Sequence, residues 1–417
     1  MNLVNRKLIG EILKYLDRRE ALVIEGARQV GKTSVLKILI SRLEKDNPCF
    51  YFDLEEIDHL RLLNRGVDEF LAYLKALGAP SNKKVFVFID EIHYLDNPTN
   101  FIKLLVDHHS HWIKLIISGS SSLALRRGLK ESLVGRKLIF SLYPLDFTEF
   151  LIFKGEDKLA ELLPAEPFTF TGDDQTRFFI NEYKKYLNEF LVMGSYPSVA
   201  LESLRERKIK LVKELVSGYV YKDVQILFSL ERITDFDRIV KSLAIRMSNL
   251  LNVSELARDT GINRGQVKEY IEMLKVTFVL ELILPYSPYH RHEVAKTPKV
   301  YFIDNGLRNA IINDFADIEM RQDRGELLEN AVYSGLLKKS LPQDNIYFWR
   351  TQNQAEVDFI LKRDNKIYPI EVSWSGKKTK ALLSFMNKYH SPNGYVIHPD
   401  CFRREDNIVY IPLWWVI

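Results

Sequence analysis

Eight consecutive residues near the N-terminus restrict the fold of this chain more than any other stretch. They read Gly26-Ala27-Arg28-Gln29-Val30-Gly31-Lys32-Thr33 and match the pattern G-x-x-x-x-G-K-[ST] at every fixed position. The apolar run at residues 21–24 predicts a strand before them, and the apolar spacing of residues 34–43 predicts an amphipathic helix after them. A strand, a glycine loop and a helix in this order form a phosphate-binding loop, because backbone amides and the positive helix end face the anion.

The same segment predicts ATP as the ligand, together with Mg²⁺. Lys32 is placed to reach the β and γ phosphates, and the Thr33 hydroxyl to coordinate the metal. The alternative is a glycine turn that matches the pattern by chance, and the flanking strand and helix argue against it. The residues expected to bind the nucleotide are Gly26, Ala27, Arg28, Gln29, Val30, Gly31, Lys32, Thr33 and Ser34.

A second strand signal ends in two carboxylates. Residues 85–91 form a β-rich apolar run that closes with Asp90 and Glu91, as is typical of a Walker B strand. We expect Asp90 at the carboxyl end of the sheet, where it helps to hold Mg²⁺. Glu91 is the candidate that directs the attacking water. The alternative is a solvated Asp-Glu turn, which the intact phosphate-binding loop disfavours.

Two further runs complete the predicted sheet. Residues 114–120 predict a strand with a polar end, where Ser118 or Ser120 could sense the γ-phosphate or orient water; a plain Ser/Gly loop is the alternative. Residues 133–140 return to the sheet as another strand. Repeated strand–helix units predict a parallel sheet covered on both faces, which is an α/β nucleotide-binding core.

Composition sets the broad class of the protein. A chain of 417 residues predicts two to four domains, and 46% hydrophobic with 27% charged residues is typical of a soluble globular protein. The net charge of +4 is too small to indicate nucleic acid by itself. Cys49 and Cys401 show no metal-ligand or redox spacing. The charged N-terminus and the lack of a long apolar segment predict a cytoplasmic protein with no membrane partner.

Several motifs together resemble the prokaryotic AAA+-type ATPases, in particular the group that carries a C-terminal domain of unknown function. The motifs are the phosphate-binding loop, Ile89-Asp90-Glu91, Ser118-Gly119-Ser120-Ser121, and Gly135-Arg136 followed by Leu142-Tyr143-Pro144-Leu145. The resemblance covers most of the chain. It implies that Arg136 acts as an arginine finger in a neighbouring subunit's site, which would require at least a dimer. Arg126 and Arg127 are rival candidates, and a surface salt bridge is the alternative.

The expected fold class is α/β, with four segments. Residues 1–155 are the AAA+-like P-loop NTPase core with its parallel sheet, and residues 156–250 are a linker and a helical lid. Residues 251–295 are a winged helix-turn-helix, and residues 296–417 are an α/β nuclease-like domain.

The third segment has the signals of a helix, a glycine turn and a second helix. Ser254 is the expected N-cap of the first helix, Gly261 the turn, and Asn263 the cap of a helix over residues 264–274, before a strand at 278–284.

In the DNA-binding version of this motif, three residues would lie on or near the groove-facing side: Arg264, Gln266 and Lys268. Glu269 and Glu272 share the helix and thin its positive charge. Winged helices also contact proteins, so both DNA and a protein partner stay open.

The last segment carries two acidic residues in a predicted hairpin. Strands at residues 356–361 and 367–373 flank the turn residues Asp364-Asn365, so Arg363 would face Lys366 and Asp358 would lie opposite Glu371. The core face would hold Val357, Phe359, Leu361, Tyr368, Ile370 and Val372. Facing carboxylates repel unless they are protonated or bridged by a cation, and Mg²⁺ would suit them.

This hairpin resembles the PD-(D/E)xK nuclease core. The resemblance implies that Glu329 is the acid on the preceding helix, beside Asp358 and Glu371. The pattern expects a lysine where this chain has Ser373, and Lys362, Lys377 and Lys378 are close enough in sequence to substitute. The alternatives are an active nuclease, a degenerate nuclease fold used for binding or assembly, and two acids on a solvated sheet face.

Three functions therefore compete. The first is a Mg²⁺-dependent ATPase whose nucleotide state repositions C-terminal DNA- or protein-binding modules. The second is a nucleotide-gated adaptor with little turnover, and the third is an ATP-dependent nuclease.

Overall fold

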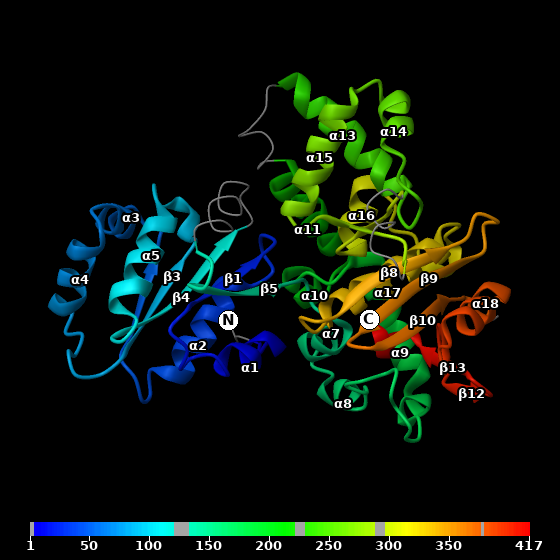
Figure 1. Ribbon diagram of the computed structural model, residues 1–417, viewed down its shortest axis with the longest axis horizontal. Coiled ribbons are helices and arrows are strands. Elements are labelled where there is room, and N and C mark those ends of the chain that lie inside the picture. The colour runs from blue at the N-terminus through cyan, green and yellow to red at the C-terminus, as the bar shows by residue number, and fades with distance from the viewer. Residues whose placement is uncertain (1–3, 121–132, 222–229, 288–296, 377–378) are drawn as a thin grey trace. The chain divides into compact units, whose positions relative to one another are not determined.

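The computed structural model describes residues 4–120, 133–221, 230–287, 297–376 and 379–417 (Figure 1). The chain divides into two compact units. The N-terminal unit comprises Met1–Tyr143 and Val276–Phe278, and the C-terminal unit comprises Pro144–Lys275 and Val279–Ile417. This division is coarser than the four predicted segments, whose boundaries near residues 155, 250 and 295 fall inside the C-terminal unit and stay predictions.

The N-terminal unit contains a five-stranded sheet in the order β2-β3-β4-β1-β5, and all its pairs are parallel. The predicted α/β class with a parallel sheet is therefore confirmed for this unit. The strands are β1 (Ala21–Gly26), β2 (Cys49–Asp53), β3 (Val85–Asp90), β4 (Ile113–Ser120) and β5 (Lys137–Leu142). The helices are α1 (Lys7–Leu13), α2 (Lys32–Leu43), α3 (Ile57–Asn64), α4 (Val67–Ala76), α5 (Pro98–His109) and the short 3-10 helix Ile92–Tyr94.

Helices cover both faces of this sheet, which is why its strands are apolar at consecutive positions. Val23, Val87 and Ile117 pack in one cluster with apolar side chains of α3, α4 and α5, and these helices lie together in Figure 1. Leu22 and Ile116, which point the other way, are also fully buried, and α2 contacts β1, β3 and β4.

Strand β5 begins later than the sequence predicted. Gly135 adopts φ +73°, so residues 133–136 form a turn and the strand starts at Lys137 instead of residue 133. The parallel pairing places Lys137 beside Ala21 and Leu142 beside Gly26. Leu142 therefore lies at the edge of the sheet from which the glycine loop leaves, and Arg136 lies at the opposite edge.

The C-terminal unit is mainly helical up to residue 276. Its helices are α7 (Phe147–Phe153), α8 (Asp157–Glu161), α9 (Ile180–Met193), α10 (Pro197–Leu201), α11 (Arg205–Leu215), the π-helix Val216–Tyr221, α13 (Leu230–Ile245), α14 (Val253–Thr260), α15 (Arg264–Val276), α16 (Asn305–Ile312), α17 (Arg324–Lys338), α18 (Lys380–Tyr389) and α19 (Leu413–Val416). Two 3-10 helices span Gln175–Phe179 and Ile318–Met320.

Helices α14 and α15 are followed by an antiparallel pair, β6 (Leu280–Ile283) and β7 (Lys299–Phe302). Gly261 makes the predicted turn with φ +74°, and the Asn263 side chain caps α15. The prediction of Ser254 as the cap of α14 is wrong: the side-chain oxygen Oδ1 of Asn252 accepts from first-turn amides, and the Ser254 amide is one of the donors. Strand β7 lies beyond the predicted segment 251–295, and the winged helix stays a prediction.

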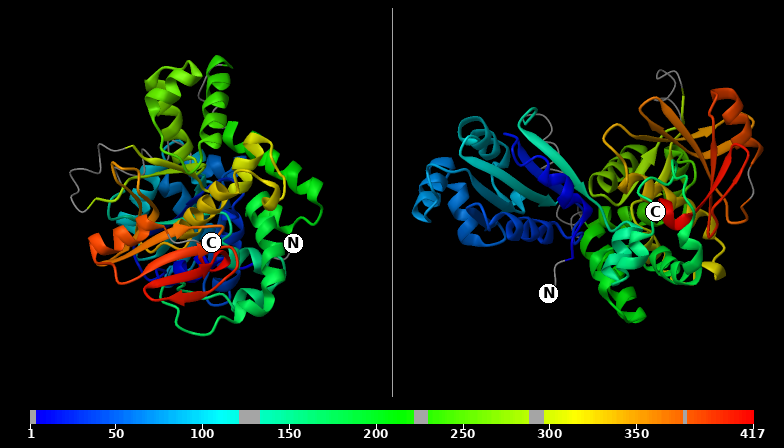
Figure 2. Two further views of the ribbon diagram at one scale, coloured as in Figure 1. Left: turned by 90° about the vertical axis from the view of Figure 1, so that its right-hand side faces the viewer. Right: turned by 90° about the horizontal axis from the view of Figure 1, so that it is seen from below.

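A six-stranded sheet closes the C-terminal unit in the order β12-β13-β11-β10-β9-β8 (Figure 2). Its strands are β8 (Asn345–Arg350), β9 (Glu356–Arg363), β10 (Lys366–Val372), β11 (Gly394–His398), β12 (Arg403–Glu405) and β13 (Ile408–Pro412). The predicted two-residue turn is present, because Arg363 pairs with Lys366 and Asp364 has φ +52°.

Strand β9 contains a β-bulge that changes which side chains share a face. Its pairing with β8 shifts between Tyr347 and Trp349. Val357 packs with Trp349 and with apolar residues of α18, whereas Phe359 stacks on Tyr333 of α17 with ring centroids 6.3 Å apart. The prediction that Val357 and Phe359 lie on one face is therefore wrong, because the extra residue of a bulge interrupts strict alternation.

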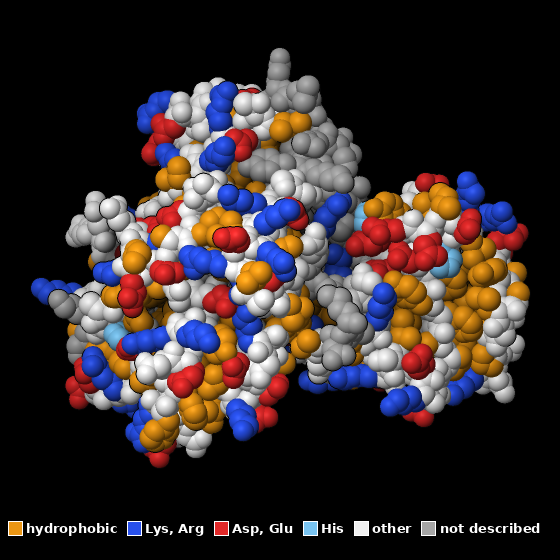
Figure 3. Space-filling model, turned by 180° about the vertical axis from the view of Figure 1, so that it is seen from behind, with side chains coloured by type: hydrophobic (Ala, Val, Ile, Leu, Met, Phe, Trp, Pro, Cys, Tyr) orange, Lys and Arg blue, Asp and Glu red, His pale blue; other side chains and the backbone are white. Residues whose placement is uncertain are grey.

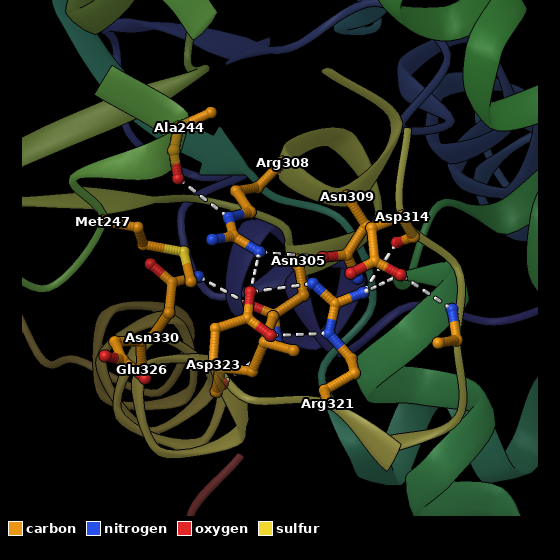
Figure 4. A network of polar contacts seen from close by, with 12 residues as sticks. Ala244, Met247, Asn305, Arg308, Asn309, Asp314, Arg321, Asp323, Glu326 and Asn330 are labelled. Atoms are coloured by element: carbon orange, nitrogen blue, oxygen red, sulfur yellow. Dashed lines mark hydrogen bonds and ion pairs between the residues drawn. The ribbon is translucent and has the colours of Figure 1, made fainter. Parts of the chain in front are cut away.

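Buried ion pairs join helices α13, α16 and α17 of this unit (Figure 4). Arg308 donates to the Ala244 carbonyl at 2.9 Å and pairs with Asp323. Arg321 donates one hydrogen bond of 2.8 Å to each carboxylate oxygen of Asp323. Burial alone would raise the pKa of Asp323, but the two guanidinium groups lower it to about 2. The network is electrostatically satisfied and needs no ligand.

Within the described residues, no helix is long and apolar enough to cross a bilayer.

Candidate nucleotide site and a second carboxylate cluster

The glycine loop leaves the sheet where β1 lies between β4 and β5. Such a position, at the carboxyl ends of parallel strands and at a change in strand order, is where α/β folds bind ligands. Gly26 cannot carry a side chain, because a Cβ atom would lie 2.2 Å from the Leu142 carbonyl oxygen. Gly31 has φ +100°, and α2 starts at the next residue. The close carbonyl at Gly26 and the left-handed backbone at Gly31 thus explain why the motif has glycine at both positions.

The start of α2 presents a positive surface. Gly31 stands at the cap position and has no side chain to accept from the first-turn amides, and the first turn holds no acidic residue. Lys32 is 4% exposed, and its ammonium donates to the carbonyl oxygens of Ala27 at 2.9 Å and Gly26 at 3.3 Å. The first-turn amides of a helix and a buried ammonium inside the loop suit an anionic phosphate.

Asp90 is a buried carboxylate supported by hydroxyl groups. Its side chain is almost fully inaccessible, the Tyr51 hydroxyl donates to Oδ2 at 3.0 Å, and the Ser118 hydroxyl donates to Oδ1. Burial and the Asp90 charge raise the pKa of Tyr51 well above its ordinary value, so its hydroxyl stays a donor. In the described part of the chain, no Lys or Arg lies within ion-pair distance of Asp90. A buried carboxylate to which no described Lys or Arg supplies a positive charge fits a divalent metal.

Glu91 is held in a strained conformation at the end of β3. Its φ is +52°, a left-handed value that is uncommon for a residue other than glycine, and its amide donates to Ser118 Oγ at 3.1 Å. Glu91 Oε1 lies 4.0 Å from Lys32 Nζ, and Oε2 lies 3.0 Å from His93 Nδ1. The predicted residues Lys32, Asp90, Glu91 and Ser118 are thus linked by contacts in one site.

Arg136 lies away from this site in its own chain. It precedes β5 at the amino ends of the parallel strands, and its Nε donates to Asp107 Oδ1 at 2.7 Å on a partly exposed surface. The structure therefore shows the salt bridge that was the alternative, and a role in a neighbouring subunit stays a prediction. Arg126, Arg127 and Ser121 lie outside the described residues, as does the side chain of Ser120.

Three residues of the site were missed from the sequence: Tyr51, His93 and Arg6. Arg6 is buried and donates to the carbonyl oxygens of Val30 in the glycine loop and Tyr143 after β5, both at 2.8 Å. His93 lies three residues beyond the Walker B aspartate, and this short spacing was a signal that could have been used.

The C-terminal cluster contains a lysine that no motif indicated. Lys299 of β7 is 4% exposed, and its ammonium lies 3.0 Å from Glu329 Oε1 and 2.5 Å from Glu356 Oε1. The hydroxyl of Tyr301 donates to Glu329 Oε1 at 2.5 Å. A lysine inside the apolar run of β7 was the available signal, because a buried ammonium requires an anionic partner.

The other two predicted acids belong to the same cluster. Asp358 Oδ2 accepts from the Val372 amide at 2.7 Å, and Glu371 Oε2 accepts from the Thr379 hydroxyl at 3.0 Å. Burial and the charges of Glu329 and Glu371 raise the pKa of Asp358 well above its ordinary value. Burial likewise raises the pKa of Glu371 to about 7, although the Thr379 hydrogen bond opposes the shift.

Lys299 supplies positive charge where the sequence predicted Mg²⁺. Burial alone would lower the pKa of Lys299, but Glu329, Asp358 and Glu356 together raise it above its ordinary value, so the ammonium stays charged. Among the described residues, no three His, Cys, Asp or Glu side chains are arranged to hold a metal ion. The cluster therefore does not fit the predicted metal.

Helix α15 presents the cations expected to contact DNA. Arg264 and Lys268 are exposed, and neither has an ion-pair partner in the described ranges. Glu272 pairs with Lys275 at 2.9 Å, which reduces the negative charge that the helix offers. Basic and acidic side chains are interspersed on the face of the C-terminal unit that Figure 3 shows.

Three protein-family models match successive parts of the chain. Residues 18–151 match the model of an AAA domain, residues 184–317 a domain of unknown function (DUF8612), and residues 324–416 another (DUF4143). The matches support an AAA-type ATPase family.

Similar proteins align with more of this chain than the AAA domain model matches. An uncharacterized protein of Methanocaldococcus jannaschii is 28% identical over 82% of this chain and 72% of its own length. A second from the same organism is 27% identical over 96% of this chain and 85% of its own. Among solved structures, the Walker-type ATPase paby2304 of Pyrococcus abyssi is 15% identical, covers 75% of this chain and 96% of its own, and has a TM-score of 0.47.

Proposed function

We propose that the N-terminal unit binds and hydrolyses ATP with Mg²⁺, and that its nucleotide state repositions modules in the C-terminal unit. The observation that carries the proposal is the convergence of three groups at one sheet edge. These are the buried ammonium of Lys32, the buried carboxylate of Asp90, which has no Lys or Arg partner among the described residues, and the Glu91 carboxylate 4.0 Å from Lys32 Nζ.

The residues divide the work of binding. The amides from residue 27 to residue 34 and the Lys32 ammonium hold the β and γ phosphates, and Lys32 exchanges its two carbonyl partners for phosphate oxygens. The Thr33 hydroxyl and Asp90 would hold Mg²⁺, and the metal would neutralise charge on the phosphates. Ser118 keeps both Asp90 and the Glu91 amide in place.

In hydrolysis, Glu91 accepts a proton from the attacking water. The water oxygen forms a bond to the γ-phosphorus, and the bond from that phosphorus to the oxygen bridging to the β-phosphate breaks. The electron pair of the broken bond stays on ADP, and phosphate leaves. Loss of the γ-phosphate removes the partner of Lys32, which is a common origin of nucleotide-dependent switching.

The test compares two substitutions in the loop and the Walker B strand. Lys32→Ala should abolish ATP binding in calorimetry, with exposed Lys37→Ala of the same helix as a control. Glu91→Gln should keep ATP binding and lower turnover by at least about a hundredfold, because it removes the base. Unchanged phosphate release in both variants would overturn the proposal. ATP binding without phosphate release by the wild-type chain would favour the nucleotide-gated adaptor.

For the C-terminal unit we propose binding instead of cleavage. Lys299 pairs with Glu329 and Glu356 where a nuclease would need a metal, so the predicted second site at Glu329, Asp358 and Glu371 carries no catalytic step. Plasmid DNA incubated with the protein, ATP and Mg²⁺ or Mn²⁺ should stay intact. Cleavage that Asp358→Ala abolishes would restore the nuclease alternative.

The proposed partner of α15 is DNA, contacted through Arg264, Gln266 and Lys268. Arg264 and Lys268 support the proposal because they are exposed and have no ion-pair partner among the described residues. Phosphate contacts release counterions, so affinity should fall steeply as salt rises. An Arg264→Ala, Lys268→Ala double variant should weaken DNA binding. Binding that does not depend on salt would favour a protein partner. An arginine finger at Arg136 would add a requirement for self-association, which turnover that rises with protein concentration would reveal.

A further inference from the structure

His93 faces the proposed catalytic glutamate from the turn that follows β3. Its Nδ1 lies 3.0 Å from Glu91 Oε2, and its side chain is 13% exposed. The ring lies against that of Tyr94, with centroids 4.4 Å apart. A carboxylate oxygen has no proton to donate, so this contact requires Nδ1 to carry the hydrogen. His93 is thus a mostly buried donor directed at one oxygen of Glu91.

The backbone of Glu91 is fixed as well. Its left-handed φ of +52° and the hydrogen bond from its amide to Ser118 leave rotation of the side chain as its main freedom. The contact to His93 restrains that rotation. With Oε2 bound to His93, Oε1 is the oxygen that faces Lys32, at 4.0 Å from Nζ.

We infer that His93 is a positioning residue for ATP hydrolysis, which keeps Glu91 Oε1 directed at the γ-phosphate side of the loop. This inference rests on the proposed ATPase function. Lys32 marks where the γ-phosphate binds, and a base must lie within hydrogen-bond reach of the water that attacks there. Without His93, the carboxylate could rotate away from Lys32 toward solvent, and fewer bound ATP molecules would meet a correctly placed base.

The experiment measures kcat and KM for ATP in variants of the full chain. His93→Ala should lower kcat by about tenfold to a hundredfold and leave KM within about twofold, since the lost contact serves the reaction and not ground-state binding. The exposed His111→Ala serves as a control and should match the wild type.

Two conservative variants separate positioning from a merely structural role. In His93→Asn the side-chain amide nitrogen takes the position of Nδ1, and in His93→Gln it takes the position of Nε2. Asn should restore kcat to within about threefold of the wild type, and Gln should stay as low as Ala. In a Glu91→Gln background, His93→Ala should cause no further loss, because the two residues act as one unit.

Each other result overturns the inference. The inference is wrong if His93→Ala is as fast as the wild type, or if it raises KM and leaves kcat unchanged. It is also wrong if the Ala, Asn and Gln variants lose equal amounts of kcat. A different result would overturn the proposed function itself. If the wild-type chain releases no more phosphate than its Glu91→Gln variant, the protein has no ATPase activity that depends on Glu91.

Discussion

The two units differ in how they stabilise buried carboxylates. In the N-terminal unit, Asp90 is buried and receives hydrogen bonds from the hydroxyls of Tyr51 and Ser118. In the C-terminal unit, Glu329 and Glu356 share the ammonium of Lys299. The first site uses neutral donors and leaves its negative charge in place, and the second contains its own cation.

This difference decides which site suits an external cation. Burying a carboxylate is costly unless a positive charge accompanies it. At Asp90 no Lys or Arg of the described residues supplies that charge, and in the proposed function Mg²⁺ would bring it together with ATP. At Lys299 the chain provides it. Burial still raises the pKa values of Asp358 and Glu371, and the Lys299 ammonium partly offsets that rise. Acidic residues at strand ends therefore indicate a metal only when the structure gives them no ammonium.

The largest effect is expected when the built-in cation is removed. Lys299→Met should lower the free energy of unfolding by about 3–5 kcal/mol, because it takes the ammonium away from Glu329, while Glu329 keeps the Tyr301 hydroxyl and Glu356 keeps its ion pair with Arg350. Urea unfolding of the full chain, followed in the transition of the C-terminal unit, measures the loss.

The exposed Lys366→Met at the hairpin turn is the matched control and should change stability little. Added Mn²⁺ that stabilises Lys299→Met and not the wild type would sharpen the comparison, since the metal would then take the position of the ammonium. Equal losses in the two lysine variants would break it.

Asp90→Asn should cause the next largest effect, on metal-dependent binding. The substitution removes the charge and keeps an acceptor for the Tyr51 hydroxyl, so ATP affinity measured with Mg²⁺ should fall by about tenfold to a hundredfold. Affinity measured in EDTA should change much less, and calorimetry with and without Mg²⁺ gives both values. The exposed Asp96→Asn is the control. An equal fall in the two conditions would show that Asp90 does not act through the metal.

Glu371→Gln should alter how stability depends on pH. The pKa of Glu371 is about 7 in the folded chain and about 4.3 in an unfolded one, so between these values the folded state binds the extra proton. Stability therefore falls as pH rises through this window. The variant, which can still accept from Thr379, should lack this slope and gain about 2 kcal/mol on the wild type between pH 4.5 and pH 8.

Glu319→Gln, on an exposed carboxyl group, should leave the pH profile of unfolding unchanged. A profile for Glu371→Gln that runs parallel to the wild type would show that this carboxyl group does not titrate in that window.

The smallest effect is expected from Tyr51→Phe. It removes the hydroxyl that donates to Asp90 Oδ2, a contribution of about 1 kcal/mol, which corresponds to about fivefold in affinity for MgATP. A loss as large as that of Asp90→Asn would mean that the hydroxyl, and not the carboxylate charge, organises the site.

The sequence predicted the features that depend on local order. The phosphate-binding loop, the Walker B strand and the hairpin turn at Asp364-Asn365 each depend on neighbouring residues, and the structure shows all three. Gly26 and Gly31 are required by a close carbonyl and by a left-handed backbone, and both conditions are built into the motif.

Features that depend on distant contacts were not predictable. Lys299 is separated by 30 residues from Glu329, and no short motif joins them. The β-bulge in β9 arises from its pairing with β8, so alternation along β9 alone placed Val357 and Phe359 on one face. The position of Arg136 at the amino edge of the sheet followed only from the register of β5 against β1.

Arg6 has a mechanical consequence. Its guanidinium donates hydrogen bonds to two backbone carbonyl oxygens. One belongs to Val30 in the glycine loop, and the other to Tyr143, the residue at which the chain leaves the N-terminal unit. Any shift of the Val30 carbonyl on ligand binding must therefore either stretch one of these two bonds or pull the departing peptide along with it. Arg6 thus links the glycine loop to the end of the N-terminal unit, where the chain continues into the C-terminal unit.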